Sequence, residues 1–264
     1  MLIICNGVFK SGSTWLHAIV LEILRANNIQ LNVVPNNYTN NINSPTTIIE
    51  SKLMEFLSKE DYINNNYITK SHYYLDETIN RRYGNQIFFF FVERDVRDAI
   101  VSHYFHIRKK YRLSFSFKLY YYMLGRLKAY EILMLNMKYK NAFGSKSFFK
   151  YSEMKGKIEN VIYKISLTLN LKPLSDKEVA LIKENTSISK MRNDLFLGKS
   201  KYYSTVQRDR EKVIRKGVVG DWKNHFSKNQ EHDIKRIEGL KISLLFQLVY
   251  YIFFTLRRKL LKVE

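Results

Sequence analysis

The sequence GVFKSGSTWL, at Gly7–Leu16, lies between an apolar run and a segment whose apolar residues have helical spacing. The apolar run is Leu2–Cys5, and the helical spacing extends over Trp15–Leu24. We therefore predict a strand, a tight turn and the start of a helix. Successive backbone N–H groups in such a turn converge on one point, and the positive end of the helix dipole adds to them. The expected ligand is a phosphate group.

The side chains of the turn fit an anion site but not a Walker A loop. Lys10 supplies a mobile positive charge, and Ser11, Ser13 and Thr14 supply short hydroxyl groups. A Walker A loop ends in Gly-Lys followed by Ser or Thr, whereas here the lysine precedes Ser11 and Gly12. A turn of this composition is by itself more often a plain connection between a strand and a helix. The assignment therefore depends on the rest of the chain.

Length and composition favour one α/β domain with anionic partners. The chain has 264 residues, 45% of them hydrophobic, and one cysteine, Cys5, which cannot form an intramolecular disulfide. A formal charge of +20 favours nucleotides, acidic lipids, anionic glycans or nucleic acid, although a biased genome explains the composition equally well. Because no basic region followed by an apolar run opens the chain, we expect a cytoplasmic protein.

Two further predicted strands end in polar residues. Tyr67–His72 has the pattern of a strand, and Lys70 and His72 fall on the same side of it. Ile87–Val92, IFFFFV, is typical of a central parallel strand that is buried on both faces, and Arg94 follows its end. In an open α/β sheet, the carboxyl ends of the strands border the ligand crevice, where these side chains should meet.

The rest of the chain is expected to be mainly helical. Irregular structure is predicted over Asn27–Ser51, and Lys199–Lys212 is predicted to be a loop. The remaining expected elements are a helix at Glu50–Asp61, a helix capped by Asp95, two helices within His103–Tyr139, a strand at Ser147–Tyr151, and helices at Ser152–Leu169 and Ser175–Met191. Arg215–Asn224, RKGVVGDWKN, combines adjacent cations with two glycines, which favours close approach of the backbone to an anion.

The C-terminal segment divides the chain into a domain at residues 1–239 and a tail at residues 240–264. Ile242–Leu256 is strongly apolar and is followed by the basic residues Arg257, Arg258 and Lys259. The apolar run is shorter than the ~20 residues that a membrane-spanning helix needs. A helix docked on the domain, a partner-binding surface and a helix lying on an anionic membrane all explain this pattern.

Four separate segments together resemble the sulfotransferases that use 3′-phosphoadenosine 5′-phosphosulfate (PAPS), particularly the cytosolic type. KSGSTWL at Lys10–Leu16 resembles the loop that binds the 5′-phosphosulfate, and TKSHYYL at Thr69–Leu75 resembles the lysine-x-histidine segment. ERDVRDAIVS at Glu93–Ser102 resembles the motif that binds the 3′-phosphate, and RKGVVGDWKNHFS at Arg215–Ser227 resembles the RKGxxGDWKNxFT signature. The resemblance implies an α/β, P-loop-like fold with a central parallel sheet flanked by helices on both sides.

The resemblance also implies an activity and residue roles. The enzyme would move a sulfuryl group from PAPS to a hydroxyl or amine, releasing 3′,5′-bisphosphoadenosine (PAP) without a metal. His72 would be the general base, Lys10 would stabilise the leaving phosphate, and Lys70 would assist at the phosphosulfate. The implied donor-binding residues are Lys10, Ser11, Gly12, Ser13, Thr14 and Trp15 in the loop, Arg94, Ser102, Arg215, Lys216 and Gly217 at the 3′-phosphate, and Trp15, Tyr151, Thr186 and Ser187 at the adenine.

The sequence also departs from the family, and alternatives remain. Phe9 replaces the usual proline before the lysine, and the dimer motif KxxxTVxxxE is poorly kept, since His232 stands in place of the glutamate, so we do not expect a homodimer by this route. The acceptor, whether a small molecule, a lipid or a glycan, is not identified. A small-molecule kinase that uses the loop for ATP, and a catalytically degenerate membrane-surface protein, are the alternatives. No nucleic-acid partner is expected, because the cations concentrate in the nucleotide motifs.

Overall fold

The structure, a computed structural model, describes residues 1–39, 47–59, 61–75, 77–199, 214–239 and 252. The loop predicted at Lys199–Lys212 lies outside the described residues except for Lys199. The apolar tail lies outside them except for Ile252.

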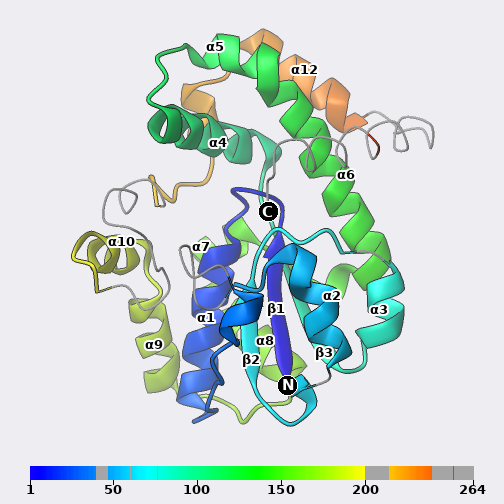
Figure 1. The fold of residues 1–264 in the computed structure, drawn as a ribbon. Coiled ribbons are helices and arrows are strands. Elements are labelled where there is room, and N and C mark those ends of the chain that lie inside the picture. The colour runs from blue at the N-terminus through cyan, green and yellow to red at the C-terminus, as the bar shows by residue number, and fades with distance from the viewer. Residues whose placement is uncertain (40–46, 60, 76, 200–213, 240–251, 253–264) are drawn as a thin grey trace.

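A four-stranded parallel sheet forms the centre of the molecule (Figure 1). Its strands are β1 (Leu2–Gly7), β2 (Tyr67–Lys70), β3 (Ile87–Glu93) and β4 (Phe148–Lys150), in the spatial order β2-β1-β3-β4. In the register of the sheet, Ile4 of β1 pairs with Thr69 of β2 and with Phe89 of β3. The strand predicted at Tyr67–His72 ends at Lys70, although the Ser71 N–H still donates a hydrogen bond of 3.3 Å to the Cys5 carbonyl.

Helices cover both faces of this sheet, which explains why β1 and β3 are continuous apolar runs. Ile3 and Cys5 face the core formed with α1 (Ser13–Ala26), α7 (Tyr151–Gly156), α8 (Ile158–Thr168), α9 (Asp176–Asn185) and α10 (Ile188–Phe196). Leu2 and Ile4 face the core formed with α2 (Glu50–Ser58), α3 (Glu77–Tyr83), α4 (Val96–Tyr111) and α6 (Arg126–Phe143). The predicted α/β fold with a central parallel sheet flanked by helices is confirmed.

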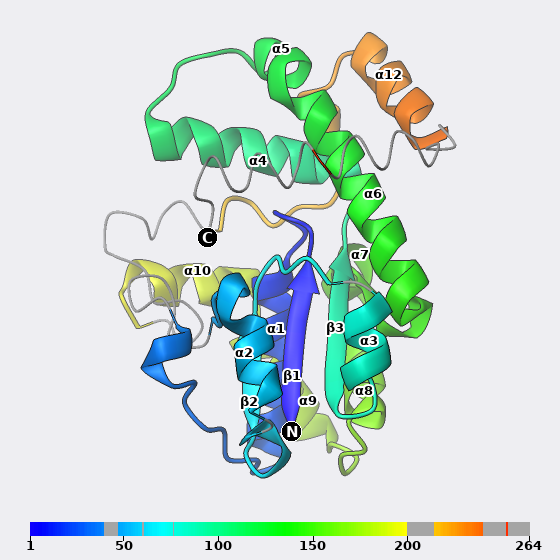
Figure 2. The ribbon, with the colours of Figure 1, turned by 45° about the vertical axis from the view of Figure 1, so that its right-hand side comes forward.

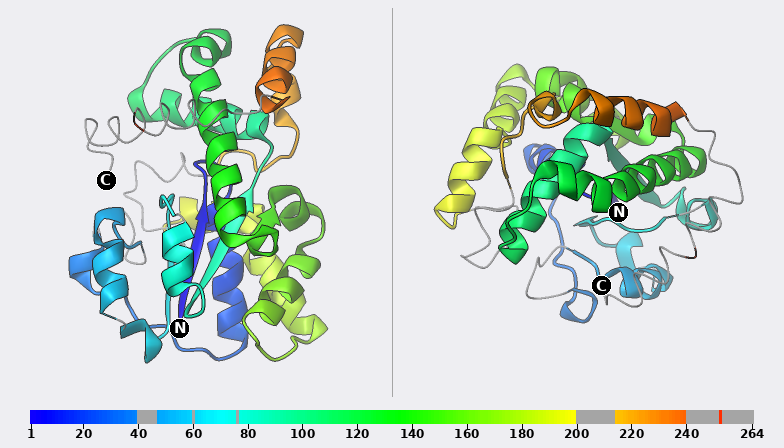
Figure 3. Two further views of the ribbon diagram at one scale, coloured as in Figure 1. Left: turned by 90° about the vertical axis from the view of Figure 1, so that its right-hand side faces the viewer. Right: turned by 90° about the horizontal axis from the view of Figure 1, so that it is seen from above.

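A lobe of helices, which we call the upper lobe, stands over the carboxyl edge of the sheet (Figures 2 and 3). It contains α4, α5 (Phe117–Tyr120), the π-helix η3 (Tyr121–Gly125), the first turns of α6, and α12 (Lys228–Gly239). As predicted, Asp95 caps α4, its side chain accepting a hydrogen bond of 2.8 Å from the Arg97 N–H. Asp233 on α12 accepts hydrogen bonds from the Tyr121 hydroxyl (2.8 Å) and the Arg126 guanidinium (3.1 Å).

Two predicted helices are each interrupted in the structure. The helix predicted at Ser152–Leu169 is α7 and α8, separated by Lys157, because Gly156 weakens the helix there. The helix predicted at Ser175–Met191 begins with the expected capping box but ends at Asn185, and α10 follows. The Ser187 hydroxyl accepts a hydrogen bond from the Lys190 N–H and so starts a new helix in place of continuing the old one.

No helix within the described ranges has both the length and the apolar character needed to cross a membrane.

Candidate functional site

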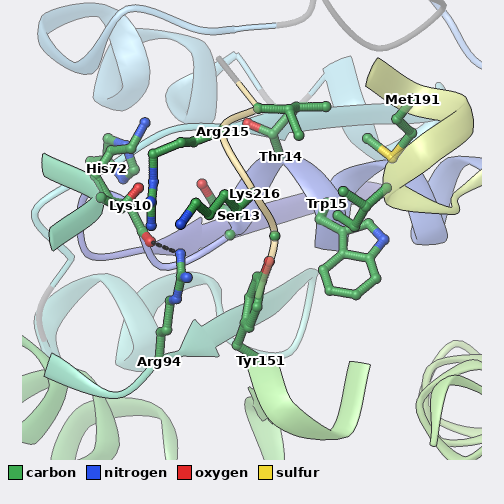
Figure 4. A pocket seen from close by; sticks show the side chains of 15 residues that line it. Lys10, Ser13, Thr14, Trp15, His72, Arg94, Tyr151, Met191, Arg215 and Lys216 are labelled. Atoms are coloured by element: carbon green, nitrogen blue, oxygen red, sulfur yellow. Dashed lines mark hydrogen bonds between the residues drawn. The ribbon is translucent and has the colours of Figure 1, made fainter. Parts of the chain in front are cut away.

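A pocket opens where β1, β2 and β3 end, between the sheet and the upper lobe (Figure 4). Its lining residues are Lys10, Gly12, Ser13, Thr14, Trp15, His72, Arg94, Ser102, Tyr151, Ile188, Met191, Ile214, Arg215, Lys216 and Gly217. Twelve of the sixteen residues predicted from sequence are in this set, so the four motifs meet at one place. The predicted residues outside it are Ser11, Lys70, Thr186 and Ser187.

The turn between β1 and α1 is held in an unusual backbone conformation. Lys10 and Gly12 have φ angles of 60° and 110°, in the left-handed region. A Cβ atom at Gly12 would lie 2.7 Å from the Tyr151 ring. The position therefore disfavours any side chain, both because of its backbone conformation and because there is no space for one. Gly12 is also the N-cap of α1 and has no side chain to accept from the first N–H groups of the helix. An anionic ligand can fill this role.

Arg94 connects the turn with the segment that begins at Arg215. One guanidinium nitrogen, Nη1, donates to the Lys10 carbonyl, and the other, Nη2, donates to the Val218 carbonyl, both at 3.2 Å. The guanidinium carbon lies 4.3 Å from the centroid of the Tyr151 ring. Arg94 therefore fixes two backbone segments that are far apart in sequence around one pocket.

Arg215 and Lys216 share a single carboxylate. Arg215 Nη1 lies 2.6 Å from Asp221 Oδ2, and Lys216 Nζ lies 3.0 Å from Asp221 Oδ1. Burial favours the neutral form of Asp221, but hydrogen bonds from the two cations hold the pKa of this carboxyl well below its usual value. One negative charge against two positive charges leaves this part of the pocket cationic, and Arg94 and Lys10 add to it. Such a site favours a doubly charged phosphate.

Asp98 holds the segment that begins at Arg215 against the upper lobe. Its carboxylate is buried on α4 and accepts hydrogen bonds from the N–H groups of Gly220 (2.8 Å) and Trp222 (3.0 Å). The neighbouring Arg97 pairs with Asp95 and lies 3.8 Å above the Trp222 ring. Sequence analysis did not assign Asp98 a role. The feature of the sequence that could have indicated a role is a carboxylate in the first turn of α4, among positions where this helix buries mainly apolar side chains.

His72 is oriented by the turn. Its Nδ1 lies 2.7 Å from the Gly7 carbonyl oxygen, which can only accept a hydrogen bond, so Nδ1 carries the proton in the neutral ring. Nε2 is then the atom able to accept a proton. The side chain remains accessible in the pocket, yet the protein packed around the ring lowers its pKa, and the nearby Lys10 and Lys70 lower it further. The imidazole is therefore neutral at physiological pH.

The two lysines also have shifted pKa values. Burial lowers the pKa of Lys10 to about 8, with Arg94 and Arg215 contributing by repulsion. Burial likewise lowers the pKa of Lys70 to about 8. Lys70 Nζ donates a hydrogen bond of 3.2 Å to the Thr14 hydroxyl, so this lysine contacts the turn although it does not line the pocket.

The opposite end of the pocket is aromatic and apolar. The Trp15 indole donates a hydrogen bond of 2.8 Å to the Thr186 carbonyl, and its ring meets the Tyr151 ring edge-on at 5.2 Å. Ile188, Met191 and Ile214 complete this end, and sequence analysis missed all three. The contribution of Ile188 and Met191 depends on the break between α9 and α10.

The hydroxyl groups of three predicted ligands are not in the pocket. The Thr186 hydroxyl donates to the Ile182 carbonyl (2.7 Å), and the Ser187 hydroxyl caps α10. The Ser11 hydroxyl is buried and faces Gly7. These residues shape the site through the backbone. Within the described part of the chain, no group of three or more His, Cys, Asp or Glu side chains is placed to hold a metal ion.

Comparisons with known proteins agree with this arrangement. Residues 2–245 match the sulfotransferase domain family. Among curated proteins, the chain is similar to human sulfotransferase 2A1, with 34% identity over 87 residues (33% of this chain, 30% of the relative). It is also similar to rabbit (Oryctolagus cuniculus) sulfotransferase 1C2, with 30% identity over 107 residues (38% and 36%). These alignments span about a third of each relative's length.

Two solved structures have a similar fold. One is mouse sulfotransferase SULT7A1 complexed with PAP, with a TM-score of 0.63, 20% identity, and coverage of 96% of this chain and 88% of that chain. The other is retinol dehydratase in complex with androsterone and the inactive cofactor PAP, with a TM-score of 0.59, 17% identity, and coverage of 89% and 79%. At these identities the likeness shows the fold, which is the P-loop-like fold of sulfotransferases.

Proposed function

Since the chain belongs to the sulfotransferase domain family, we propose that it transfers the sulfuryl group of PAPS to a hydroxyl or amine of an acceptor and releases PAP. The observation that carries this proposal is that one pocket holds both His72 and the cation group of Arg94, Arg215 and Lys216. A base alone fits many hydrolases, and a cation group alone fits any phosphate ligand. A base and a cation group in the same pocket fit group transfer from a nucleotide that carries two separate phosphates. The relatives of similar fold, which are PAP complexes, support the same donor.

In the proposed reaction, Nε2 of His72 takes the proton of the acceptor as the acceptor atom bonds to sulfur. The bond between sulfur and the bridging oxygen of the 5′-phosphate breaks in the same in-line step. Lys10 neutralises the charge that develops on that oxygen, and Lys70 supports the turn through Thr14. The step needs no metal, because the proton goes to His72 and the leaving charge is held by lysine.

The residues fit the two ends of the donor. Arg94, Ser102, Arg215, Lys216 and Gly217 would hold the 3′-phosphate, which distinguishes PAPS from ATP. The aromatic end at Trp15 and Tyr151 would hold the adenine between an indole face and apolar side chains. The φ of 65° at Gly217, whose Cβ would lie 2.7 Å from Ile188, keeps that backbone close to the apolar end.

Calorimetric titration of PAP into the full-length protein tests the donor site. We expect micromolar or tighter binding by the wild type and loss of at least two orders of magnitude in an Arg94→Ala, Arg215→Ala double variant. A Lys172→Ala, Lys177→Ala variant removes two exposed cations outside the pocket and should bind PAP as the wild type does. If ATP binds more tightly than PAP, the kinase alternative replaces this proposal. If the folded wild type binds neither, the degenerate alternative does.

The location of the enzyme and the role of its tail are further proposals. We place the enzyme in the cytoplasm and propose that the apolar tail at residues 240–264, most of which lies beyond the family match at residues 2–245, attaches it to an anionic membrane. The pattern of Ile242–Leu256 followed by three cations supports this. Flotation of the full chain with anionic liposomes, compared with a chain truncated after Gly239, tests the tail. Unchanged flotation after truncation would contradict it.

A further inference from the structure

The outer end of the upper lobe combines exposed apolar side chains with an excess of cations. From Ala99 to Tyr130 the sequence has seven Lys or Arg residues and no Asp or Glu. We call residues 108–127 the tip: it comprises the end of α4, the connection to α5, α5 itself, and the helical turns that follow. The tip lies at the top of the molecule in Figures 1 and 2, on the side away from the sheet.

The helical run in the tip has apolar residues on both its inner and its outer side. Tyr120 and Tyr121 are buried against the lobe. Leu119, Tyr122 and Met123 are exposed, and Met123 is 64% exposed. Leu119 lies in α5, and Tyr122 and Met123 lie in the π-helix η3 that continues it, so the three exposed side chains come from adjacent turns. An apolar side that the fold leaves in water, next to a buried one, is typical of a binding surface.

The tip is held in place by the core, so its exposed apolar groups are not the result of loose packing. The Tyr104 hydroxyl donates a hydrogen bond of 2.8 Å to the Phe115 carbonyl, and its ring lies 5.3 Å from the Phe117 ring. Ser116 caps α5 by accepting a hydrogen bond from the Leu119 N–H. The connection therefore inserts two aromatic rings into the lobe and presents its remaining side chains outward.

Exposed cations precede this apolar surface in the sequence of the tip. Lys109, Lys110 and Arg112 lie at the end of α4, and Lys118 lies within α5; all four are exposed. The connection adds Tyr111, which is 58% exposed. Tyrosine, leucine and methionine side chains enter the boundary between lipid head groups and acyl chains, while lysine and arginine extend to the phosphates.

We propose that the tip binds the surface of an anionic lipid bilayer. Charge complementarity favours this occupant, because basic residues are attracted to an anionic leaflet and the tip itself contains no acidic residue; Asp233 of α12 pairs with Arg126. Ser102, which lines the donor pocket, and Tyr111 of the tip are both on α4 and are separated by nine residues, a rise of about 13 Å. A bound bilayer would therefore lie close to the pocket. The inference depends neither on the proposed transfer reaction nor on the tail.

Vesicle flotation of the full-length chain tests the proposal. The vesicles contain phosphatidylcholine with 30% phosphatidylserine, and pure phosphatidylcholine vesicles are the reference. We expect a Leu119→Asp, Met123→Asp variant to bind at least tenfold more weakly than the wild type. Its matched control is Leu167→Asp, Phe196→Asp, with two side chains each 66% exposed on α8 and α10. The control should bind within twofold of the wild type, since the tail and the net charge are the same in both variants.

A labelled cysteine shows which surface enters the lipid. Because Cys5 is buried, a cysteine introduced at the surface can be labelled selectively with an environment-sensitive dye. We expect a blue shift of the dye on adding anionic vesicles to Met123→Cys and none for Leu167→Cys. Equal shifts at both sites, equal weakening by both double variants, or no binding of the wild type to anionic vesicles would overturn the proposal. In the last case, a protein partner would be the remaining explanation for the surface.

Discussion

Asp98 Oδ2 accepts a hydrogen bond of 2.8 Å from the N–H of Gly220, 122 residues away in the sequence. The other carboxylate oxygen accepts from the Trp222 N–H at 3.0 Å. The segment that contains Arg215 and Lys216 is thus held by α4, the same helix that carries Ser102 into the pocket. The two cations reach the pocket only when this segment is in place.

Replacing Asp98 should therefore weaken donor binding without touching the donor. Asp98→Ala leaves the partly buried Gly220 N–H and the buried Trp222 N–H without their acceptor, which costs about 2–4 kcal/mol of folding free energy. We expect at least a tenfold weaker affinity for PAP by calorimetry and a lower midpoint of thermal unfolding. Asp98→Asn keeps one acceptor oxygen and should lose less of both. Wild-type affinity in a folded Asp98→Ala variant would show that the segment holds its position by other contacts.

His72→Ala should abolish turnover and leave donor binding intact. Loss of a general base lowers kcat by roughly 10²–10⁴-fold. The pKa of His72 is below its usual value, so the base is already neutral at pH 7. The wild-type kcat should accordingly be constant around neutral pH and fall only in acid, as the ring becomes protonated. Single-turnover rates with labelled PAPS measure this profile. A kcat that rises through pH 7–8 would contradict the lowered pKa of His72, and would show that the hydrogen bond to the Gly7 carbonyl, which favours the charged ring, outweighs burial and the two lysines.

Donor affinity should decrease at alkaline pH because of Lys10 and Lys70. Both have a pKa of about 8 in the free protein, so each is about half charged at pH 8 and loses the rest of its charge as the pH rises further. A bound phosphate stabilises the charged form and raises both values. Binding of PAP at pH 8 should therefore take up protons, and titration in buffers of different ionisation enthalpy counts them. Lys10→Met should reduce the uptake, whereas the distant Lys172→Met should not. Equal uptake in both variants would exclude Lys10 as its source.

The sequence predicted those parts of the site that depend on local pattern. Apolar runs marked β1 and β3, and the residues that follow a buried parallel strand must lie at its carboxyl edge, which places Lys10 and Arg94 together. Strand periodicity predicted that Lys70 and His72 lie on the same side of one strand. The strand ends at Lys70 and only His72 lines the pocket, although both residues contact the turn, through Thr14 and Gly7. These relations need no knowledge of distant contacts.

Other features depend on contacts that the sequence does not display. Thr186 and Ser187 were predicted to lie at the adenine. Their hydroxyl groups complete helix ends, and the Thr186 carbonyl accepts the hydrogen bond of the Trp15 indole. A polar side chain that hydrogen-bonds to nearby backbone can end a helix without changing the spacing of the apolar residues. The break between α9 and α10 could therefore not be predicted from that spacing. The role of Asp98 was missed for a similar reason, since both its partners lie beyond residue 219.

Gly12→Ala should weaken donor binding by changing the turn locally. A matched substitution at a second glycine, Gly156, distinguishes this local effect from a general loss of stability. The added Cβ would meet the Tyr151 ring at 2.7 Å in a backbone conformation with φ of 110°. Relieving the contact must displace either the first turn of α1 or Tyr151, at a cost of about 1–3 kcal/mol. We expect PAP affinity to fall by at least tenfold. Gly156, at the end of α7, has nothing within 4 Å of an added Cβ, so Gly156→Ala should bind PAP normally and unfold at the same or a higher temperature. If both variants bind PAP equally well, the turn tolerates a side chain and its N–H groups do not define the phosphate position.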